Sequence, residues 1–278
     1  MARAGLLAVA ALCLAAAQAL ADDGVASEGK LSDKDFFRLA TCGATPGGAC
    51  LGPVVRWPDP ELSVALAPAH RRYPPELGEA VSQALDHAID QINRAGSAIR
   101  ITRDDRLSEP DIIISRPALS EGEKTRNIPR MPNGHQIGVG FMWLWWNERG
   151  EITEASVLIA EDITIEDIRS VMLEELFQTL GFIYDIENRY YEGRSILSQD
   201  SNATTTLIGQ DRKALRRAPP LGEQRRLALV DRHVIGRERP RGAVMQPHQR
   251  FGARHAHLEL HRHHRQPRPG DRQHMLHA

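Results

Sequence analysis

Two carboxylates and an amide stand at a spacing that could do chemistry. Glu174 and Gln178 are four residues apart, and Glu175 lies next to the first of them. On a helix, side chains four apart project side by side, so Glu174 and Gln178 could bind one ion or one ligand from the same face. Asp185 follows shortly and adds a third carboxylate. These four side chains are therefore the candidate site residues.

The stretch that carries them, Thr164 to Asp185, is expected to form a helix. Thr164 followed by Asp167 resembles a capping box with Asp in the last place, and Gly181 is a natural C-terminal stop. The buried side of this helix should be the apolar stripe of Ile168, Met172, Leu176 and Leu180. Glu174 and Gln178 are therefore expected on a different face.

The other expected elements place this helix in an α+β domain. A long amphipathic helix is expected from Glu76 to Ala95, because apolar residues recur along it at spacings of three and four. Strands are expected at 54–57, 62–66, 99–101 and 111–115, and shorter helices at 32–38 and 209–216. This order predicts a mixed β-sheet packed by two principal helices.

The segment 138–160 is expected to form a β-hairpin with its turn at Asn147–Gly150. Its first arm holds three of the four Trp in the chain. Aromatic side chains this dense could form a shelf for a ligand, but core packing is the commoner outcome. Residues 116–134, rich in Pro, Gly and charge, are expected to form a surface loop. His135, directly after them, is the histidine best placed to approach a site.

The local motifs resemble those of the zincin metallopeptidases. The zinc-binding helix of that group carries His-Glu-x-x-His, often followed by x-x-Gly-x-x-His, and this chain has Glu174-Glu175-x-x-Gln178-x-x-Gly181-x-x-Tyr184 in the same register. Ser195-Ile196-Leu197-Ser198 stands where metzincins carry Ser-x-Met before the turn under the metal. The resemblance runs from about Phe36 to Arg217. Within that outline the chain is similar to a family of exported bacterial proteins known only as a domain of unknown function.

The resemblance implies a zincin-like domain over residues 22–217 with a degenerate zinc motif. Glu175 alone keeps the identity of the family's residue, the catalytic general base. Glu174, Gln178 and Tyr184 stand in place of the three His ligands. A Gln amide is a weak, neutral ligand compared with imidazole, and a base without a metal-activated water has little to act on. We therefore expect a protein that binds no cofactor and has no peptidase activity.

Three interpretations of Glu174, Glu175 and Gln178 stay open at this level. They could form a solvated or hydrogen-bonded helix face in a catalytically silent relative. They could line a binding site for a peptide or protein partner. With Asp185 they could instead form an atypical metal site, in which oxygen ligands would favour calcium or manganese over zinc. The first two predict an exported binding protein, and the third predicts a metal-dependent hydrolase or peptidase whose cofactor is zinc or another divalent metal.

The first 21 residues are typical of a secretory signal peptide. Arg3 is followed by an apolar run from Leu6 to Ala17, and Ala19-x-Ala21 precedes two acidic residues. Cleavage after Ala21 would leave no membrane anchor and would place the mature chain in the bacterial periplasm or outside the cell. A retained anchor helix is the rarer alternative.

Export changes how the cysteines are interpreted. Cys42 and Cys50 remain after cleavage, and an even pair in an exported protein is more often a disulfide than two buried thiols. A loop this small would stabilise the fold by about 2–3 kcal/mol in the chain-entropy model. We therefore expect a Cys42–Cys50 bond that pins the N-terminal segment.

From residue 218 the composition changes to Arg, His, Pro and Gln. Residues 219–278 contain 12 Arg and 5 acidic residues, a balance of +7 in a chain whose formal net charge is -1. We expect residues 218–278 to be disordered, or to be the product of a shifted reading frame. His257, His261 and His264 would share one helix face, so a metal-binding tail is an alternative. Clustered Arg could also bind a phosphate backbone, but export argues against a nucleic-acid partner.

Overall fold

The computed structural model describes residues 24–218. The expected signal peptide, residues 1–21, and all of the expected tail beyond Ala218 lie outside the described residues. In chain order the elements are β1 (Gly24–Ala26), α1 (Asp33–Cys42), β2 (Glu61–Leu66), α2 (Pro75–Arg94), β3 (Arg100–Arg103), β4 (Ile112–Ser115), β5 (Gly140–Trp146), β6 (Ile152–Ile159), α3 (Ile168–Gln178), β7 (Asp185–Glu187) and α4 (Gly209–Arg217). The chain is an α+β protein, as the order of its sequence patterns predicted.

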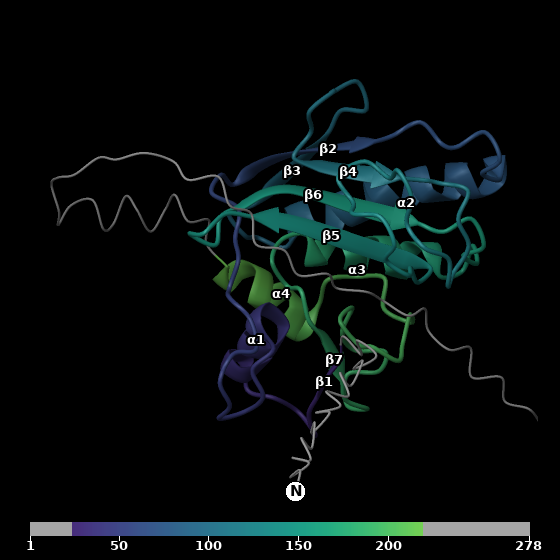
Figure 1. Ribbon diagram of the computed structural model, residues 1–278. Coiled ribbons are helices and arrows are strands. Elements are labelled where there is room, and N and C mark those ends of the chain that lie inside the picture. Colours follow the sequence, from purple (N-terminus) through teal and green to yellow (C-terminus); the bar gives the residue numbers. More distant parts are fainter. Residues whose placement is uncertain (1–23, 219–278) are drawn as a thin grey trace, which may run out of the picture.

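The principal sheet has five strands in the order β3-β2-β4-β6-β5 (Figure 1). Four of its strands are parallel, and β5 runs antiparallel to β6 at one edge. The predicted hairpin is confirmed, with its turn closed by a hydrogen bond from Gly150 N to Asn147 O of 2.9 Å. The sheet is therefore mixed, and its only antiparallel strand among the described residues lies at an edge.

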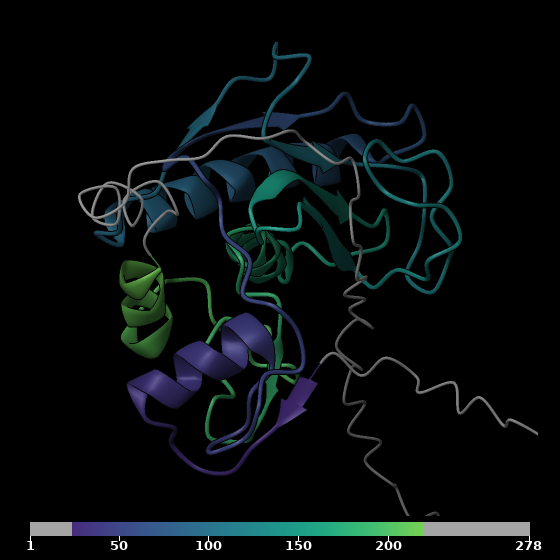
Figure 2. The ribbon, with the colours of Figure 1, turned by 60° about the vertical axis from the view of Figure 1, so that its left-hand side comes forward.

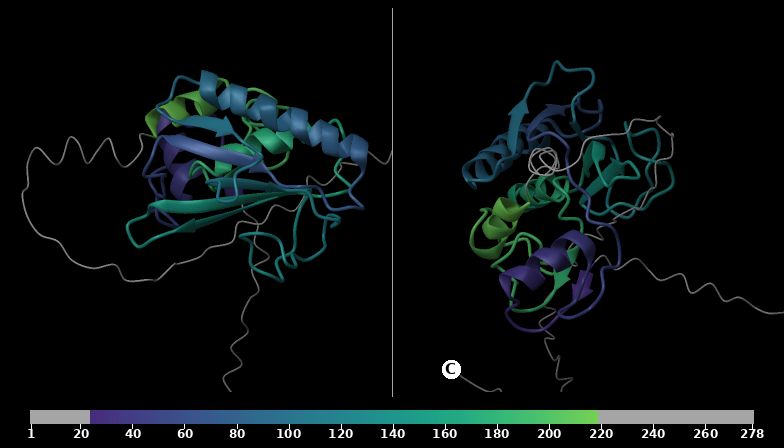
Figure 3. Two further views of the ribbon diagram at one scale, coloured as in Figure 1. Left: turned by 90° about the horizontal axis from the view of Figure 1, so that it is seen from above. Right: turned by 90° about the vertical axis from the view of Figure 1, so that its left-hand side faces the viewer.

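Helices α2 and α3 cover one face of this sheet (Figure 3). The strands send alternate apolar side chains toward them, among which Met142 and Leu144 of β5 and Val157 of β6 belong to the main core. The amphipathic pattern predicted α2 to within one residue at each end. The two principal helices of the sequence analysis are thus α2 and α3.

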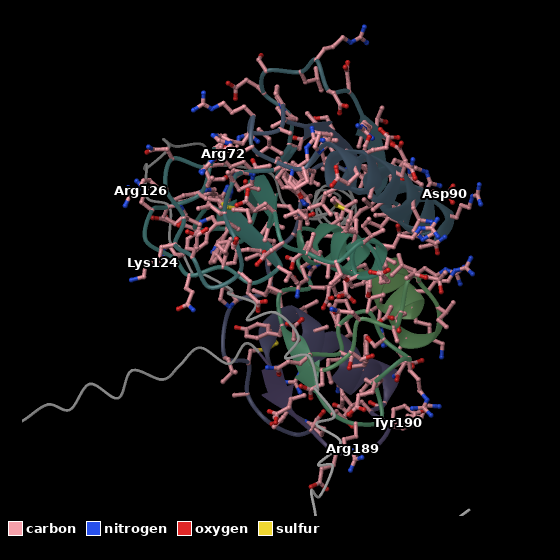
Figure 4. The ribbon with its side chains drawn as sticks, turned by 90° about the vertical axis from the view of Figure 1, so that its right-hand side faces the viewer. Arg72, Asp90, Lys124, Arg126, Arg189 and Tyr190 are labelled. Atoms are coloured by element: carbon pink, nitrogen blue, oxygen red, sulfur yellow. A yellow bond between two sulfur atoms is a disulfide. The ribbon has the colours of Figure 1, made fainter. Side chains whose placement is uncertain are left out.

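The opposite face of β5 and β6 is covered by the loop between β4 and β5. Phe141 and Trp143 of β5 pack there with Met131 and Ile137 of the loop in a second, smaller core. The aromatic residues of β5 therefore serve mainly as core packing, the commoner outcome expected: Phe141, Trp143 and Trp146 are buried, and Trp145 is partly buried. The loop is also a surface loop as expected, since Lys124 and other charged side chains extend outward from it (Figure 4).

The prediction of a strand at residues 54–57 was wrong. Only Arg56 forms an isolated bridge, to Glu151 at the end of the hairpin. Pro53 and Pro58 flank this segment, and proline cannot donate to a strand ladder. The segment instead crosses from the disulfide loop to the hairpin, and Trp57 donates from Nε1 to the carbonyl of Thr179 over 2.8 Å.

A lower layer of α1, α4 and the two-stranded sheet of β1 and β7 lies on the other side of α3 (Figure 2). The predicted Ser32 cap of α1 is present, and the helix runs on to Cys42. Cys42 is bonded to Cys50, which confirms the expected disulfide. Two arginines of α4, Arg212 and Arg216, donate to the carbonyl of Ala95 after α2.

None of the helices in residues 24–218 combines the length and the apolar composition that a membrane span needs.

Candidate functional site

From Ser170 to Gln178, helix α3 is buried on every side. It lies between the sheet and the lower layer, so Ile168 and all residues from Ser170 to Gln178 are buried. The expected division into an apolar buried face and a separate polar face was therefore wrong, because the helix has packed neighbours all round. Thr164 and Asp167 do form the predicted hydrogen-bonded pair, with Thr164 Oγ1 2.8 Å from Asp167 Oδ2, but in the turn that precedes the helix.

The structure brings Gln178 and Asp185 together. Gln178 donates from Nε2 to Oδ1 of Asp185 over 2.7 Å. Both side chains are buried, with exposed fractions of 4% and 1%. Gln178 ends α3 and Asp185 begins β7, so the short turn between the two elements makes this contact possible. Two residues that were predicted as metal ligands, Gln178 and Asp185, are thus hydrogen-bonded to each other.

The two glutamates of the candidate site are also buried, with exposed fractions of 0% for Glu174 and 1% for Glu175. Glu175 lies directly beneath the first residue of β5. A Cβ placed on Gly140 would come within 2.5 Å of Glu175 Oε1 and 2.4 Å of Val171 Cγ1. The absence of a side chain at Gly140 therefore makes room for the Glu175 carboxylate next to the edge strand.

Gly181 shapes the turn after α3. Its φ of +99° is a conformation that other residues rarely adopt, and a Cβ there would lie 2.4 Å from Val55 O. The helix end is closed by Thr179, whose Oγ1 donates to Leu176 O over 2.6 Å. The crossing segment 54–57 thus packs directly on the turn that carries the chain from Gln178 to Asp185.

Tyr184, which stands in place of the third ligand, is packed toward α1. Its backbone N donates to Ala40 O over 3.1 Å. A Cβ on Gly43 would lie 2.9 Å from Tyr184 Cε1, so the ring rests against the start of the disulfide loop. Burial raises the pKa of the Tyr184 hydroxyl.

His135 does not approach α3. Its ring centroid lies 4.7 Å from that of Trp143, in the smaller core on the other face of the sheet. Burial lowers the pKa of the His135 imidazole. His135 was expected near the site because it precedes the hairpin. The alternation of side chains along β5 directs Trp143 away from α3, and His135 packs against Trp143 on that face.

Sequence reasoning missed one buried acid, Asp211 of α4. Its Oδ1 accepts from Ser195 Oγ over 2.6 Å, and its Oδ2 accepts from Ile196 N over 3.1 Å. Burial raises the pKa of this carboxyl to about 7, although both hydrogen bonds act in the opposite direction. The available signal was an acid in the first turn of an expected helix, which usually indicates only a favourable charge at the helix start.

Within residues 24–218 no group of three or more His, Cys, Asp or Glu side chains is placed to hold a metal ion. No protein-family model matches the chain. No curated protein matches it either.

Proposed function

We propose that this chain is an exported, zincin-like binding protein that holds an extended peptide or protein segment without cutting it. The hydrogen bond between Gln178 and Asp185 is the observation that supports binding without cleavage. A metal at this position would have to take the neutral amide oxygen of Gln178, which is a weak ligand. Without a metal-activated water, Glu175 has no reaction in which to act as a base.

The binding part rests on the outer edge of β5. Ala160 N donates to Val139 O over 2.9 Å, which fixes the hydrogen-bonded pairs of the β5–β6 ladder. By the antiparallel alternation, Gly140, Met142 and Leu144 direct their N–H and C=O groups away from β6. No strand among residues 24–218 pairs with this outer edge. It can therefore add a strand from a partner.

The two edges of the sheet differ in a way that favours β5. The opposite edge strand, β3, is short and carries Arg100 and Arg103, and charged, short edges resist pairing. Strand β5 is longer, has no charged residue, and is covered on both faces by α3 and by the loop. Gly140, Met142 and Leu144 are buried, so a partner would be recognised through their outward backbone groups and not through their side chains, as in other complexes that add a strand to a sheet.

The test uses peptides as probes. A phage-displayed library of random decapeptides is selected on the purified protein, and recovered peptides are synthesised with single N-methyl groups along the backbone. We expect N-methylation to weaken binding at every second residue and to have little effect at the residues between, because only alternate N–H groups face β5. Failure to recover a peptide, or an effect that ignores this alternation, contradicts the proposal.

A second candidate function is a metal-dependent hydrolase with atypical ligands. The observation that favours it is the contact of Glu175 with Gly140, which sets a carboxylate beside the proposed peptide site. Metal content and casein hydrolysis of the purified protein decide between the two. Stoichiometric zinc with an activity that Glu175→Gln abolishes would replace the binding proposal by this one.

A converse experiment asks whether the helix still suits zinc. Glu174→His with Gln178→His restores two imidazoles at the spacing that one helix face supplies. Zinc binding by this double variant, absent in Glu174→Ala with Gln178→Ala, supports the zincin-like origin of the core.

A further inference from the structure

A pocket of about 450 Å³ opens between the start of α1 and the last turns of α4. The two helices lie next to each other in the lower layer (Figure 2). The volume falls within the range of roughly 300–1,000 Å³ that small-molecule sites occupy. None of the candidate site residues of α3 and β7 lines the pocket. Its lining residues are Ser32, Asp33, Lys34, Lys213 and Arg217.

One face of α4 supplies two positive charges to this pocket. Gln210, Lys213 and Arg217 follow each other at spacings of three and four, so their side chains lie on the same side of the helix. That side faces the first turn of α1, because Gln210 Nε2 donates to Asp33 Oδ1 over 3.0 Å and Lys213 Nζ donates to Asp33 Oδ2 over 2.9 Å. Arg217 therefore reaches the pocket one turn beyond Lys213.

The pocket lining carries more positive than negative charge. Asp33 is its only carboxylate, and the hydrogen bond from Lys213 lowers the pKa of that carboxyl, so Asp33 is ionised and paired with Lys213. Lys34 and Arg217 form no ion pair with another described residue. Asp35 of α1 does not line the pocket. Three cations and one carboxylate give the lining a formal charge of +2, which suits an anion with two charges.

A phosphate group has the charge and the oxygens that match this arrangement. It carries about −1.5 to −2 charges at neutral pH and presents three strong acceptor oxygens. A guanidinium can donate two parallel N–H groups to two of these oxygens, and an ammonium can donate to the third. A single carboxylate offers fewer oxygens and only one charge.

We propose that the pocket between α1 and α4 binds a phosphate group, with Lys34 and Arg217 as its donors. Lys213 stays paired with Asp33 and adds to the positive field. The group can belong to inorganic phosphate or to a phosphate monoester, because both present the same oxygens. The site is independent of the peptide binding proposed for β5.

NMR titration of the purified protein with inorganic phosphate tests the site. At physiological ionic strength, where weak attraction between exposed charges is screened, we expect saturable shifts of the backbone amides of 32–34 and 213–217. Phenyl phosphate at the same pH then distinguishes the two sources. Binding of the monoester at least as tight as that of inorganic phosphate indicates a phosphorylated small molecule, and its exclusion indicates the free ion. Shifts that do not saturate, or that are absent from these two segments, overturn the proposal.

Two double variants separate the pocket from a general attraction of anions. Lys34→Gln with Arg217→Gln removes both unpaired cations, so the dissociation constant for phosphate should rise by at least about tenfold. Arg72→Gln with Lys124→Gln removes the same charge from exposed positions on the sheet side of the molecule (Figure 4) and should leave the constant unchanged. Equal weakening by both pairs would show that only net charge matters, and would overturn the site.

Asp33→Asn changes the pocket in the opposite direction. It removes the only carboxylate of the lining and frees Lys213, so phosphate should bind more tightly than to the wild type. Asp33, Lys34 and Arg217 are exposed, and the amide spectrum of each variant verifies that the fold is retained. Weaker binding by a folded Asp33→Asn variant would contradict the charge argument and the site with it.

Discussion

Gln178 and Asp185 stand at the two ends of the turn that follows α3, and a hydrogen bond of 2.7 Å joins their buried side chains. The bond ties the last residue of the central helix to the first residue of β7. Gln178 stands at the position of a zinc-binding His in the zincin motif, and its side chain is an amide. The hydrogen bond to Asp185 occupies that amide. The two roles are connected, because the same turn that excludes solvent from Gln178 brings Asp185 within reach.

This pair should be energetically coupled. Asp185→Ala leaves the buried Gln178 amide without its acceptor, which is expected to cost about 1–3 kcal/mol of unfolding free energy. Gln178→Leu in the same background should then cost less than it does alone, with a coupling of about 0.5–3 kcal/mol. Urea unfolding of the two single variants and the double variant measures this cycle. Additive costs would mean that the hydrogen bond contributes nothing to stability.

Gly181→Ala should be strongly destabilising for two reasons. A side chain at positive φ costs about 1–2 kcal/mol, and the new Cβ would lie 2.4 Å from Val55 O. Gly134→Ala is the matched control, because its φ of +90° is similar and no atom lies within 4 Å of its Cβ position. We expect Gly181→Ala to lower the free energy of unfolding by clearly more than Gly134→Ala does. Equal losses would show that the crossing segment moves aside without cost.

Repeating local patterns account for the parts of the fold that the sequence predicted. The three-and-four spacing of α2, the turn at Asn147–Gly150 and the Ser32 cap are each determined by neighbouring residues, and each appears as expected. The disulfide was predicted from the signal-like N-terminal residues and the pair of cysteines that follows them. Such features need no knowledge of which elements meet in space.

Contacts between distant segments account for what the sequence did not predict. Val54–Trp57 has strand-like residues, but its partners are Gly150, Glu151 and Thr179, so it crosses the sheet end and forms no strand. The burial of Glu174 depends on layers on both sides of α3, which a helix pattern cannot show. Asp211 is buried against the turn at Ser195 and Ile196, 16 and 15 residues earlier in the chain, and the helix pattern of α4 does not show this contact. The spacing of the residues thus located the candidate site, but it did not predict the burial and the contacts of those residues.

Gly140→Ala should displace the Glu175 side chain. The added methyl group would overlap Glu175 and Val171, and overpacking of this kind costs about 1–3 kcal/mol. Glu175→Ala should recover part of this loss, because it removes Oε1 and Cγ of Glu175 and leaves only Val171 Cγ1 in the way. Thermal or urea unfolding of both single variants and of the pair gives the coupling. If the costs add, Glu175 does not lie beneath β5.

Loss of the disulfide should weaken the fold without abolishing it. Cys42→Ser with Cys50→Ser is expected to lower the free energy of unfolding by about 2–3 kcal/mol in the chain-entropy model. The loop keeps hydrogen bonds from Leu51 N to Cys42 O and from Arg38 Nη2 to Gly48 O. Circular dichroism should therefore show an unchanged fold with a lower midpoint in urea. Complete unfolding in buffer would mean that the bond holds more than the N-terminal segment.

The buried Asp211 should make stability fall as the pH rises. Burial raises its pKa from 3.8 to about 7, so between these values the folded chain binds more protons at this site than the unfolded chain does. By linkage, the contribution of Asp211 to stability is fully present below about pH 4 and is lost as the pH rises to about 7. Asp211→Asn removes this titration and leaves the other groups in place.

The difference in unfolding free energy between wild type and Asp211→Asn isolates that contribution, because titrations shared by both proteins cancel. It should decrease from about pH 4 to about pH 7, by up to about 4 kcal/mol, and remain level above that. Urea unfolding at a series of pH values provides the measurement. A difference that increases with pH would show that the two hydrogen bonds outweigh burial and that the carboxylate is the favoured form in the folded protein.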